Sequence, residues 1–267
     1  MNKQPLVSII IRTKNEERWV NLCLEKIFLQ EYKNKEIIIV DNFSTDKTLE
    51  KIKKFKIKKI IKLKTYLPGK ALNLGIKNSN GQIIIIISAH CIPVNNKWLS
   101  NLVQVMISNK DCAGVYGRQE PMNFTNNNDL RDLFLLFGLD KKTQIKDPFF
   151  HNANSMIRKS IWKKIQFDET VKHIEDRVWS SLIIGNKTKI IYEPKASVIH
   201  FHGVGHHSNK GRVSTISKML TKKLKFSTKS KKIIAIIPVE RPVILNKKYI
   251  LFDTLNELIK LKEISKI

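Results

Sequence analysis

Short apolar runs alternate with amphipathic stretches along the first half of the 267-residue chain. A strand that is buried on both faces of a parallel sheet is a nearly continuous apolar run, because crossover helices cover both faces. The pattern therefore predicts an α/β sheet with helices on both sides. Its first four strands are expected at Val7–Ile11, Glu36–Val40, Lys59–Leu63 and Ile83–Ser88.

Apolar residues at helical spacing separate these strands. One helix is expected between Trp19 and Gln30, and a loop followed by an amphipathic helix within Pro93–Met106. Residues 119–150 are rich in Asn, Asp, Pro and Phe, which predicts loops and one helix around a cleft. Further strands are expected at Cys112–Tyr116, near Lys189–Tyr192 and at Ala196–His202.

The composition changes again after residue 205. Residues 206–232 hold eight lysines, one arginine and no acid, with apolar residues at helical spacing from Val213 to Leu224. Such a segment either lies on an anionic membrane surface or packs its apolar stripe on the rest of the protein. Residues 233–267 begin with a fresh strand signal, loosely resemble the opening strand and helix of sugar cytidylyltransferases, and lack the glycine-rich loop expected after Pro238.

The formal net charge is +26, and most of the excess is lysine. A charge of this size raises the question of a polyanionic partner. Only eight residues are arginine, the side chain better suited to bidentate contacts with bases and phosphates. We therefore expect no specific nucleic-acid partner, although a basic nucleic-acid-binding protein remains the alternative from a different functional class.

The cysteines and the amino-terminal sequence indicate the cellular compartment in which the protein is expected. The three cysteines have no paired short spacing, so neither a disulfide framework nor a zinc ribbon is indicated. The amino terminus reaches charged residues too soon for a signal peptide, and no apolar run approaches the ~20 residues that span a bilayer. We expect a cytoplasmic protein that is soluble or peripheral at the inner face of the cell membrane.

A polar cluster follows the second predicted strand, in the segment Val40–Asp46. In open α/β sheets, ligands bind beyond the carboxyl ends of the strands, which places Asp41 where a ribose or base would bind. Ser44 and Asp46 also suit an ordinary helix cap. The cluster is thus a candidate nucleotide contact, a helix start, or both.

Five segments, VSIIIRTKNEE, VDNFSTDKT, PGKALNLGI, ISAHCIP and HIEDRVW, occur in that order within residues 5–205. The ordered series resembles family 2 glycosyltransferases with the GT-A fold, which is a Rossmann-like, mixed but mainly parallel sheet flanked by helices. The resemblance implies transfer of a sugar from a nucleotide-diphosphate sugar to an acceptor hydroxyl, with inversion. Similar enzymes commonly assemble cell-surface polysaccharide or glycolipid, so the expected acceptor is a saccharide or lipid-linked molecule.

The resemblance also implies an organisation and a donor site. Residues 1–205 would be the transferase domain, with a nucleotide-sugar half, 1–117, and an acceptor half, 118–205. Residues 206–232 would be a basic linker or amphipathic helix, and 233–267 an extension or a truncated second module. The implied donor contacts are Thr13, Asn15, Glu16, Asp41, Asn42, Lys70, Asn73, Ser88 and His90.

The family's metal motif, Asp-x-Asp, would fall on Ser88–Cys91, and the chain lacks both acids. Carboxylates hold Mg²⁺ or Mn²⁺, and the cation offsets charge on the departing diphosphate. A histidine at position 90 suits Mn²⁺ better than Mg²⁺. His200 and His202 point to one face of a predicted strand and would complete a site with His90. The alternative is a metal-free enzyme that neutralises the leaving group by hydrogen bonds from histidine and Lys70.

Glu175 and Asp176 match the position of the family's catalytic base. Inverting transfer needs a carboxylate within hydrogen-bond reach of the acceptor hydroxyl, and Asp176 is expected to be that base. Glu175 is expected to hold the acceptor, although the pair also suits the start of a helix. Candidate sugar or acceptor contacts in nearby polar clusters are Arg118, Gln119, Glu120, Asn152 and Asn154. Loss of the metal acids leaves open an impaired protein that binds nucleotide-sugar without transfer.

Overall fold

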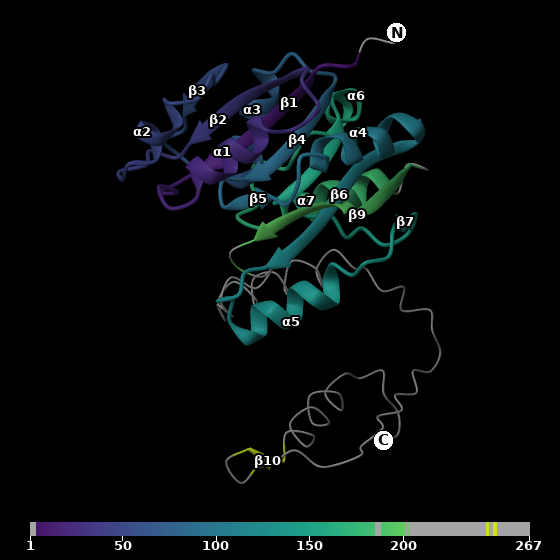
Figure 1. Cartoon of the computed structure of the whole chain (residues 1–267). Coiled ribbons are helices and arrows are strands. Elements are labelled where there is room, and N and C mark those ends of the chain that lie inside the picture. Colours follow the sequence, from purple (N-terminus) through teal and green to yellow (C-terminus); the bar gives the residue numbers. More distant parts are fainter. Residues whose placement is uncertain (1–3, 185–187, 201, 203–243, 246–247, 250–267) are drawn as a thin grey trace. The chain divides into compact units, whose positions relative to one another are not determined.

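The computed structural model describes residues 4–184, 188–200, 202, 244–245 and 248–249. The chain divides into two compact units, residues 1–216 and 217–267. The described residues of the second unit are an antiparallel pair, β10 (Ile244–Leu245) and β11 (Lys248–Tyr249). The first unit is built on a nine-stranded sheet, in the order β3-β2-β1-β4-β8-β6-β9-β5 with β7 beside β9 (Figure 1).

The sheet is mixed. Its nine strands are β1 (Val7–Thr13), β2 (Lys35–Asp41), β3 (Lys59–Lys62), β4 (Ile83–Ser88), β5 (Cys91–Pro93), β6 (Cys112–Pro121), β7 (Lys142–Gln144), β8 (Asn154–Arg158) and β9 (Lys189–His200). β3, β2, β1 and β4 are parallel neighbours, and so are β6 and β9. β8 runs antiparallel between β4 and β6, and β5 and β7 run antiparallel to β9. The four strands predicted first are therefore confirmed as a parallel set.

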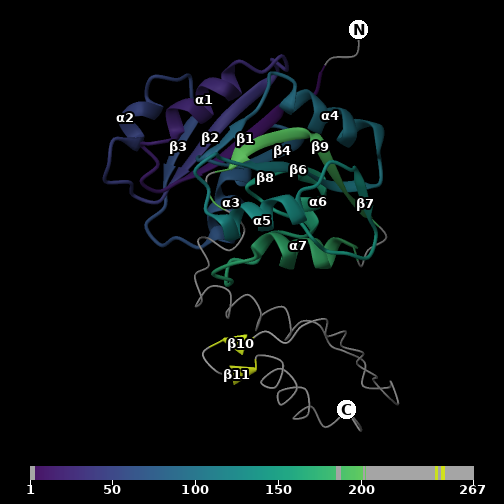
Figure 2. The same cartoon turned by 60° about the horizontal axis from the view of Figure 1, so that its bottom comes forward.

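Helices cover both faces of the sheet (Figure 2). The core on one face is formed with α1 (Val20–Phe28), α2 (Thr48–Ile52) and α4 (Trp98–Ser108). The core on the other face is formed with α3 (Pro68–Lys77), α5 (Asn127–Leu136), α6 (Lys159–Lys164) and α7 (Glu175–Ile184). Residues 83–87, all isoleucine, alternate between the two cores and are all buried. Burial on both faces explains the continuous apolar runs of β1, β2 and β4, whereas β3, at the edge of the sheet, is largely exposed.

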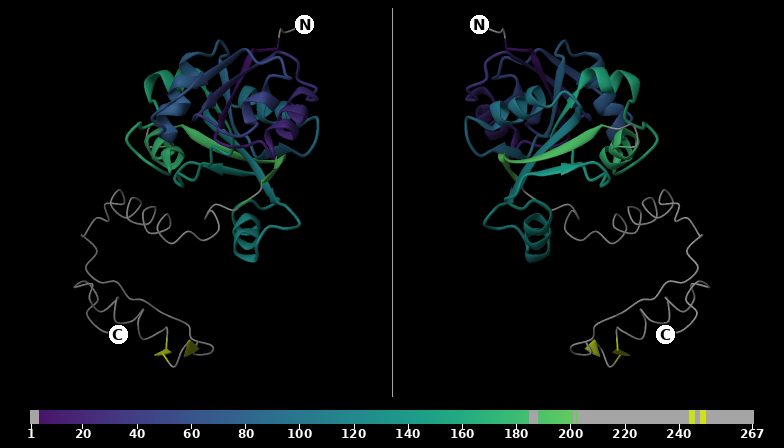
Figure 3. Two further views of the ribbon diagram at one scale, coloured as in Figure 1. Left: turned by 90° about the vertical axis from the view of Figure 1, so that its left-hand side faces the viewer. Right: turned by 90° about the vertical axis from the view of Figure 1, so that its right-hand side faces the viewer.

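Beyond the parallel set, the structure differs from the predicted pattern at β9 and at the short strands β5, β7 and β8. Two strands were expected where the structure forms one, β9. Its register with β6 shifts between Gly117 and Gln119, and β9 therefore continues past Pro194, where a break was expected. A Cβ on Gly117 would lie 2.0 Å from the carbonyl oxygen of Ala196, so only glycine permits this approach. β5, β7 and β8 were not expected as strands. Figure 3 shows α5 at the margin of the unit, beyond the end of β6.

Residues 206–232 lie outside the described part of the chain, as does most of 233–267, so their predicted roles stay predictions. None of the described helices has the length and apolar character that crossing a bilayer requires.

Candidate active site

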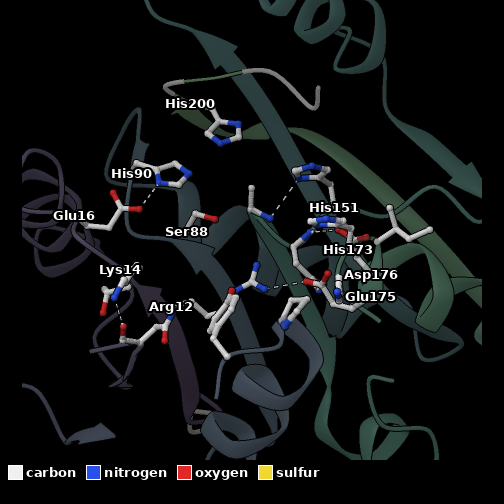
Figure 4. A pocket seen from close by; sticks show the side chains of 18 of the residues that line it. Arg12, Lys14, Glu16, Ser88, His90, His151, His173, Glu175, Asp176 and His200 are labelled. Atoms are coloured by element: carbon white, nitrogen blue, oxygen red, sulfur yellow. Dashed lines mark hydrogen bonds and ion pairs between the residues drawn. The ribbon is translucent and has the colours of Figure 1, made fainter. Parts of the chain in front are cut away.

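The parallel strands bring their carboxyl ends to one edge of the sheet. Thr13 is paired in register with Asp41, and Arg12 with Ser88. The segments that follow these ends, together with the turn before β8 and the start of α7, enclose a cavity of about 460 Å³ (Figure 4). A cavity of this size suits a small-molecule ligand. Its lining residues are Arg12, Thr13, Lys14, Glu16, Asn42, Tyr66, Pro68, Ser88, His90, His151, Asn152, Ala153, Lys172, His173, Ile174, Glu175, Asp176, Arg177 and His200.

Asp41 supports the wall of this cavity and is not among its lining residues. Its side chain is fully buried, and it accepts hydrogen bonds from the Thr13 hydroxyl at 2.8 Å, the Ser44 hydroxyl at 2.6 Å and the Ser44 backbone N–H at 2.9 Å. The adjacent Asn42 does line the cavity. The arrangement makes Asp41 the anchor of the loop that carries Asn42.

The loop after β1 is held against the loop after β2. Asn15 has a left-handed backbone, with φ at 54°, and its side-chain oxygen accepts from the Thr45 N–H. Lys14 donates to the carbonyl oxygens of Asn42 and Phe43. Of these residues, Lys14 and Asn42 line the cavity, whereas Asn15 does not. The turn presents Glu16 to the cavity next to His90 (Figure 4).

The acidic pair opens α7 at the cavity wall. Glu175 accepts a hydrogen bond from Arg12 at 2.9 Å, which joins the helix to β1. Asp176 accepts from the backbone N–H of Asn152 at 3.1 Å and of Arg177 at 2.8 Å. Ile174, immediately before the pair, has a φ of 57°. A left-handed backbone is rare for a β-branched residue and is strained. The turn at Ile174 directs the acidic pair toward the cavity.

Burial raises the pKa of the Asp176 carboxyl above its ordinary value, and the backbone N–H groups of Asn152 and Arg177 oppose that rise. The side chain nevertheless remains one of the cavity-lining residues. A carboxylate whose pKa is raised is a stronger base when it is ionised. The chemistry of this position therefore suits proton abstraction.

Three histidines cluster together, and two of them, His90 and His200, line the cavity across from the acidic pair (Figure 4). The ring centroids of His90 and His200 are 5.3 Å apart, those of His90 and His202 are 4.9 Å apart, and those of His200 and His202 are 4.6 Å apart. Nδ1 of His90 lies 2.7 Å from a carboxylate oxygen of Glu16. The structure thus brings together the three histidines that were expected to form one group.

Two expected donor contacts on α3 lie elsewhere. Lys70 is half-buried and does not line the cavity. The side chain of Asn73 is a structural bridge, because its amide donates to the Phe167 carbonyl and to Glu169, and its oxygen accepts from Trp162. We conclude that Asn73 fixes the segment before α7 against α3.

The expected sugar or acceptor contacts divide in a similar way. Asn152 lines the cavity. Gln119 does not, but its Nε2 lies 2.9 Å from Nδ1 of His151, which is a lining residue. Arg118 and Glu120 approach each other at 3.6 Å on β6. Asn154 is buried and bonds Trp98 and two backbone carbonyls. Of these five residues, only Asn152 is among the lining residues.

Several lining residues were not singled out from the sequence. Lys14, Lys172 and Arg177 add positive charge, and Tyr66 and His173 add an aromatic ring and an imidazole. Arg12 was also missed. A signal for it existed, because an arginine that ends a run of buried isoleucines is costly unless it is paired.

Comparison with known proteins places these observations in a family. The family model "Glycosyl transferase family 2" matches residues 8–166. A dolichyl N-acetyl-α-D-glucosaminyl phosphate 3-β-D-2,3-diacetamido-2,3-dideoxy-β-D-glucuronosyltransferase of Methanococcus voltae is 43% identical over 104 residues, covering 36% of this chain and 32% of that protein. A UDP-Glc:α-D-GlcNAc-diphosphoundecaprenol β-1,3-glucosyltransferase of Escherichia coli, WfaP, is 37% identical over 108 residues, covering 39% and 43%.

Solved structures share the fold. Staphylococcus aureus TarS in complex with UDP-GlcNAc superposes with a TM-score of 0.61 at 19% identity, covering 76% of this chain and 61% of that one. A mannosyltransferase of Pyrobaculum calidifontis in complex with GDP-Man and Mn²⁺ gives 0.62 at 17% identity, covering 82% and 65%.

The chain spans less than two thirds of the length of each of these four proteins. The GT-A fold expected from the sequence is confirmed by the superpositions, and the family resemblance by the matched model. From the ordered motifs, the parallel strand ends and the family match over 159 residues, 8 to 166 inclusive, the chain belongs to glycosyl transferase family 2.

Proposed function

We propose that the chain transfers a glycosyl group from a nucleotide-diphosphate sugar to an acceptor hydroxyl, with inversion at the anomeric carbon. The observation that carries the proposal is the position of Asp176, a buried carboxylate that lines a cavity at the carboxyl ends of the parallel strands. Basic side chains line the same cavity. An activated sugar needs both, because the base serves the acceptor and the cations serve the diphosphate.

Asp176 acts as the base in this proposal. Its carboxylate takes the proton of the acceptor hydroxyl while that oxygen forms a bond to the anomeric carbon. The bond from the anomeric carbon to the diphosphate oxygen breaks on the opposite face, and the nucleoside diphosphate leaves with the electron pair. Glu175, paired with Arg12, holds the helix start in position.

Lys14, Lys172 and Arg177 are the proposed contacts of the negatively charged donor, because all three line the cavity. Hydrogen bonds from a cationic donor to phosphate are among the strong ones. Asn42 and Thr13, also at the wall, are proposed to lie beside the nucleoside. Asp41 positions Thr13 through the hydrogen bond already described.

A divalent cation is proposed to assist the leaving group. Two solved complexes of this fold, those of the Pyrobaculum enzyme and of GalNAc-T7, contain Mn²⁺. In this chain, His90 lies in the segment where the resemblance expects the family's carboxylate pair, and the rings of His200 and His202 lie near it. Imidazole nitrogen is a suitable donor for transition metals. When bound, a cation would offset the charge that develops on the diphosphate. Ser88 lines the cavity beside His90.

The acceptor is proposed to be a saccharide or a lipid-linked saccharide. The names of the relatives include dolichyl- and undecaprenol-linked acceptors, and that of TarS a poly(ribitol-phosphate). This points to assembly of cell-surface polysaccharide or glycolipid. We further propose that the protein works at the cytoplasmic face of the membrane, with the basic segment 206–232 as the contact.

The organisation of the chain is proposed on the same basis: a transferase domain, 1–205, with donor-binding and acceptor-binding halves that meet at residue 117, and a separate segment 233–267. Of the proposed donor contacts, Thr13, Lys14 and Asn42 fall in the first half, whereas Lys172 and Arg177 come from the second, beside Asp176.

Replacement of the base tests the function. Asp176→Asn should lower the transfer rate at least ~10²-fold and leave the affinity for uridine or guanosine diphosphate within about twofold. The matched control is Asp140→Asn, because Asp140 is an exposed acid outside the cavity. Donor turnover would be monitored as the release of nucleoside diphosphate. The acceptors would be poly(ribitol-phosphate) and lipid-linked saccharides.

Each other outcome identifies one of the alternatives. Nucleotide binding without release by the unmodified chain would identify an impaired transferase. Tight, salt-sensitive binding of DNA or RNA that is indifferent to Asp176 would identify a basic nucleic-acid-binding protein. Normal transfer by Asp176→Asn would remove Asp176 from the role of base.

A further inference from the structure

A second cavity lies at the edge of the sheet opposite the candidate active site, and we call it the basal cavity. Its volume is about 560 Å³, and its lining includes Pro5, just before β1, and Ile83, the first residue of β4. The active-site cavity is lined by Arg12 and Ser88, near the other ends of the same two strands. The extended chain from Ile83 to Ser88 spans ~17 Å. The two cavities share no lining residue, so the basal cavity is a separate place on the molecule.

Four cations and no acid are among the described residues that line the basal cavity. The cations are Lys110, which follows α4, Arg158, which ends β8, and Lys159 and Lys163 of α6. Within the described ranges, none of the four forms an ion pair with a carboxylate. A concave surface lined by charges of one sign concentrates ions of the other sign. The cavity should therefore attract an anion.

The neighbouring acids do not neutralise this charge. Glu36 pairs with Lys58, and Asp111 pairs with Lys189 at 2.9 Å. Neither acid lines the basal cavity. Because each acid already has a lysine partner of its own, the two pairs add no net charge, and the excess of the four lining cations remains.

Arg158 is held in place by backbone carbonyl groups. Its Nε donates to the carbonyl oxygen of Cys112 at 2.8 Å, and its Nη2 donates to those of Met106 and Asn109. No hydrogen bond to its Nη1 occurs within the described part of the chain. Carbonyl oxygens carry no formal charge, so the guanidinium is fixed while its positive charge stays uncompensated. Nη1 is the nitrogen that remains to bind a ligand in the cavity.

The three lysines differ in their freedom. Lys159 is half-buried, and its Nζ donates to the carbonyl oxygen of Ser79 at 2.6 Å. Burial lowers the pKa of Lys159, and the charge of Lys163 adds to that effect. An anion in the cavity would offset both costs. Lys110 and Lys163 are exposed, and Ser160 adds a hydroxyl to the same lining.

Phosphate oxygens suit this set of groups, because guanidinium and ammonium groups form strong, charge-assisted hydrogen bonds with them. The described lining holds no aromatic ring that could stack on a base or a sugar. We propose that the basal cavity binds a phosphate-bearing anion, with Arg158 and Lys159 as fixed contacts and Lys110 and Lys163 as contacts from the surface. Inorganic pyrophosphate and the headgroup of an anionic phospholipid both have this chemistry. The proposal does not rest on the proposed function, because the two cavities share no residue.

Calorimetric titration of the full chain with sodium pyrophosphate tests the site. The active-site cavity is also basic, so variants assign the binding. The double variant Lys110→Ala/Lys163→Ala should weaken one class of pyrophosphate binding about 10-fold, since each exposed charge pair is worth up to ~5-fold. Lys172→Ala, in the active-site cavity, should leave that class unchanged. The matched control is Lys164→Ala, an exposed lysine of α6 that lines neither cavity.

Vesicles of phosphatidylcholine, with and without phosphatidylglycerol, provide the second arm, in which co-sedimentation of the same variants is measured. Weaker pyrophosphate binding by the double variant would identify a free anion as the ligand, and weaker vesicle binding a lipid headgroup; either supports the proposal. Unchanged binding of both probes by the double variant, or equal weakening by Lys164→Ala, would overturn it. All three replaced lysines are exposed, so the variants should fold, and thermal melting checks this.

Discussion

Nη1 of Arg12 lies 2.9 Å from Oε1 of Glu175, across 163 positions of sequence. The two side chains are 16% and 7% exposed, so the pair is largely removed from water. It ties the end of β1 to the first residue of α7, beside the proposed base. The pair therefore couples β1 to the start of α7, which belong to the two halves proposed to bind donor and acceptor.

Arg12→Met should destabilise the protein by about 3 kcal/mol, because a buried carboxylate is left without its partner. Glu175→Gln should cost less, and the double variant should cost less than the sum of the two singles. Urea unfolding of the four proteins measures the cycle. A coupling energy near zero would show that solvent screens the pair.

The activity of the proposed base should depend on pH. Because burial raises the pKa of Asp176, the transfer rate should fall as the pH decreases through that raised value, about tenfold per unit below it. The pH profile of kcat/KM measures this. A rate that stays constant down to about pH 4, the ordinary carboxyl range, would contradict the assignment.

The stability of the protein should also depend on pH through Asp176. The stability contribution should fall as the pH rises, whereas the transfer rate should fall as the pH decreases. A carboxyl whose pKa is higher in the folded state stabilises the fold below its unfolded pKa, and this contribution is lost as the pH rises through the folded pKa. Relative to Asp176→Asn, the unmodified chain should lose stability as the pH rises from about 4, the ordinary carboxyl range, through the raised folded pKa, by at most ~1.4 kcal/mol per unit. Urea unfolding of both proteins across that range checks the slope.

At the left-handed backbone of Ile174, glycine should be more stable than alanine, which is the reverse of the order within a helix. At a φ of 57°, Ile174→Gly should be more stable than Ile174→Ala by about 1 kcal/mol, because glycine has no Cβ to clash. At Ser181, an exposed position within α7, alanine should be favoured over glycine by about 1 kcal/mol. Thermal or urea unfolding of the four variants compares the two positions. The same order at both would mean that Ile174 is unstrained.

Asn73→Ala should destabilise the fold by about 2–3 kcal/mol, because it leaves buried partners on the segment before α7 without hydrogen bonds. Metal-free affinity for uridine or guanosine diphosphate should be unchanged in the folded variant. Lys172→Ala, at an exposed lysine that lines the cavity, should show the converse, with weaker nucleotide binding and little loss of stability. Calorimetric binding and unfolding curves for both variants distinguish a residue that stabilises the fold from one that contacts the nucleotide.

The sequence patterns predicted the parallel strands well, because residues 83–87 and similar runs must be buried on both faces wherever they occur. The short strands of the second half carry less signal. β5 has three residues, and β8 begins with Asn154, whose side chain bonds Trp98 and the carbonyls of Arg118 and Ala196. Such strands depend on neighbours, which a local pattern does not contain.

The site shows a similar division. Glu16, Asn42, His90 and Asp176 were expected in the site and line its cavity, because the ends of parallel strands fall on one edge. Asn73 has the same polar chemistry but bonds to Trp162 and the segment after it. Whether an asparagine contacts a ligand or the protein depends on tertiary packing.

The register between β1, β2 and β4 limits how this protein can be altered. Arg12 and Thr13 are successive residues with opposite side-chain directions, and each is matched to a partner on a neighbouring strand. Deletion of one residue in β1 would exchange these directions and turn Arg12 away from Glu175. Donor preference should therefore diverge among descendants through substitutions and loop insertions, while the length of β1 stays fixed.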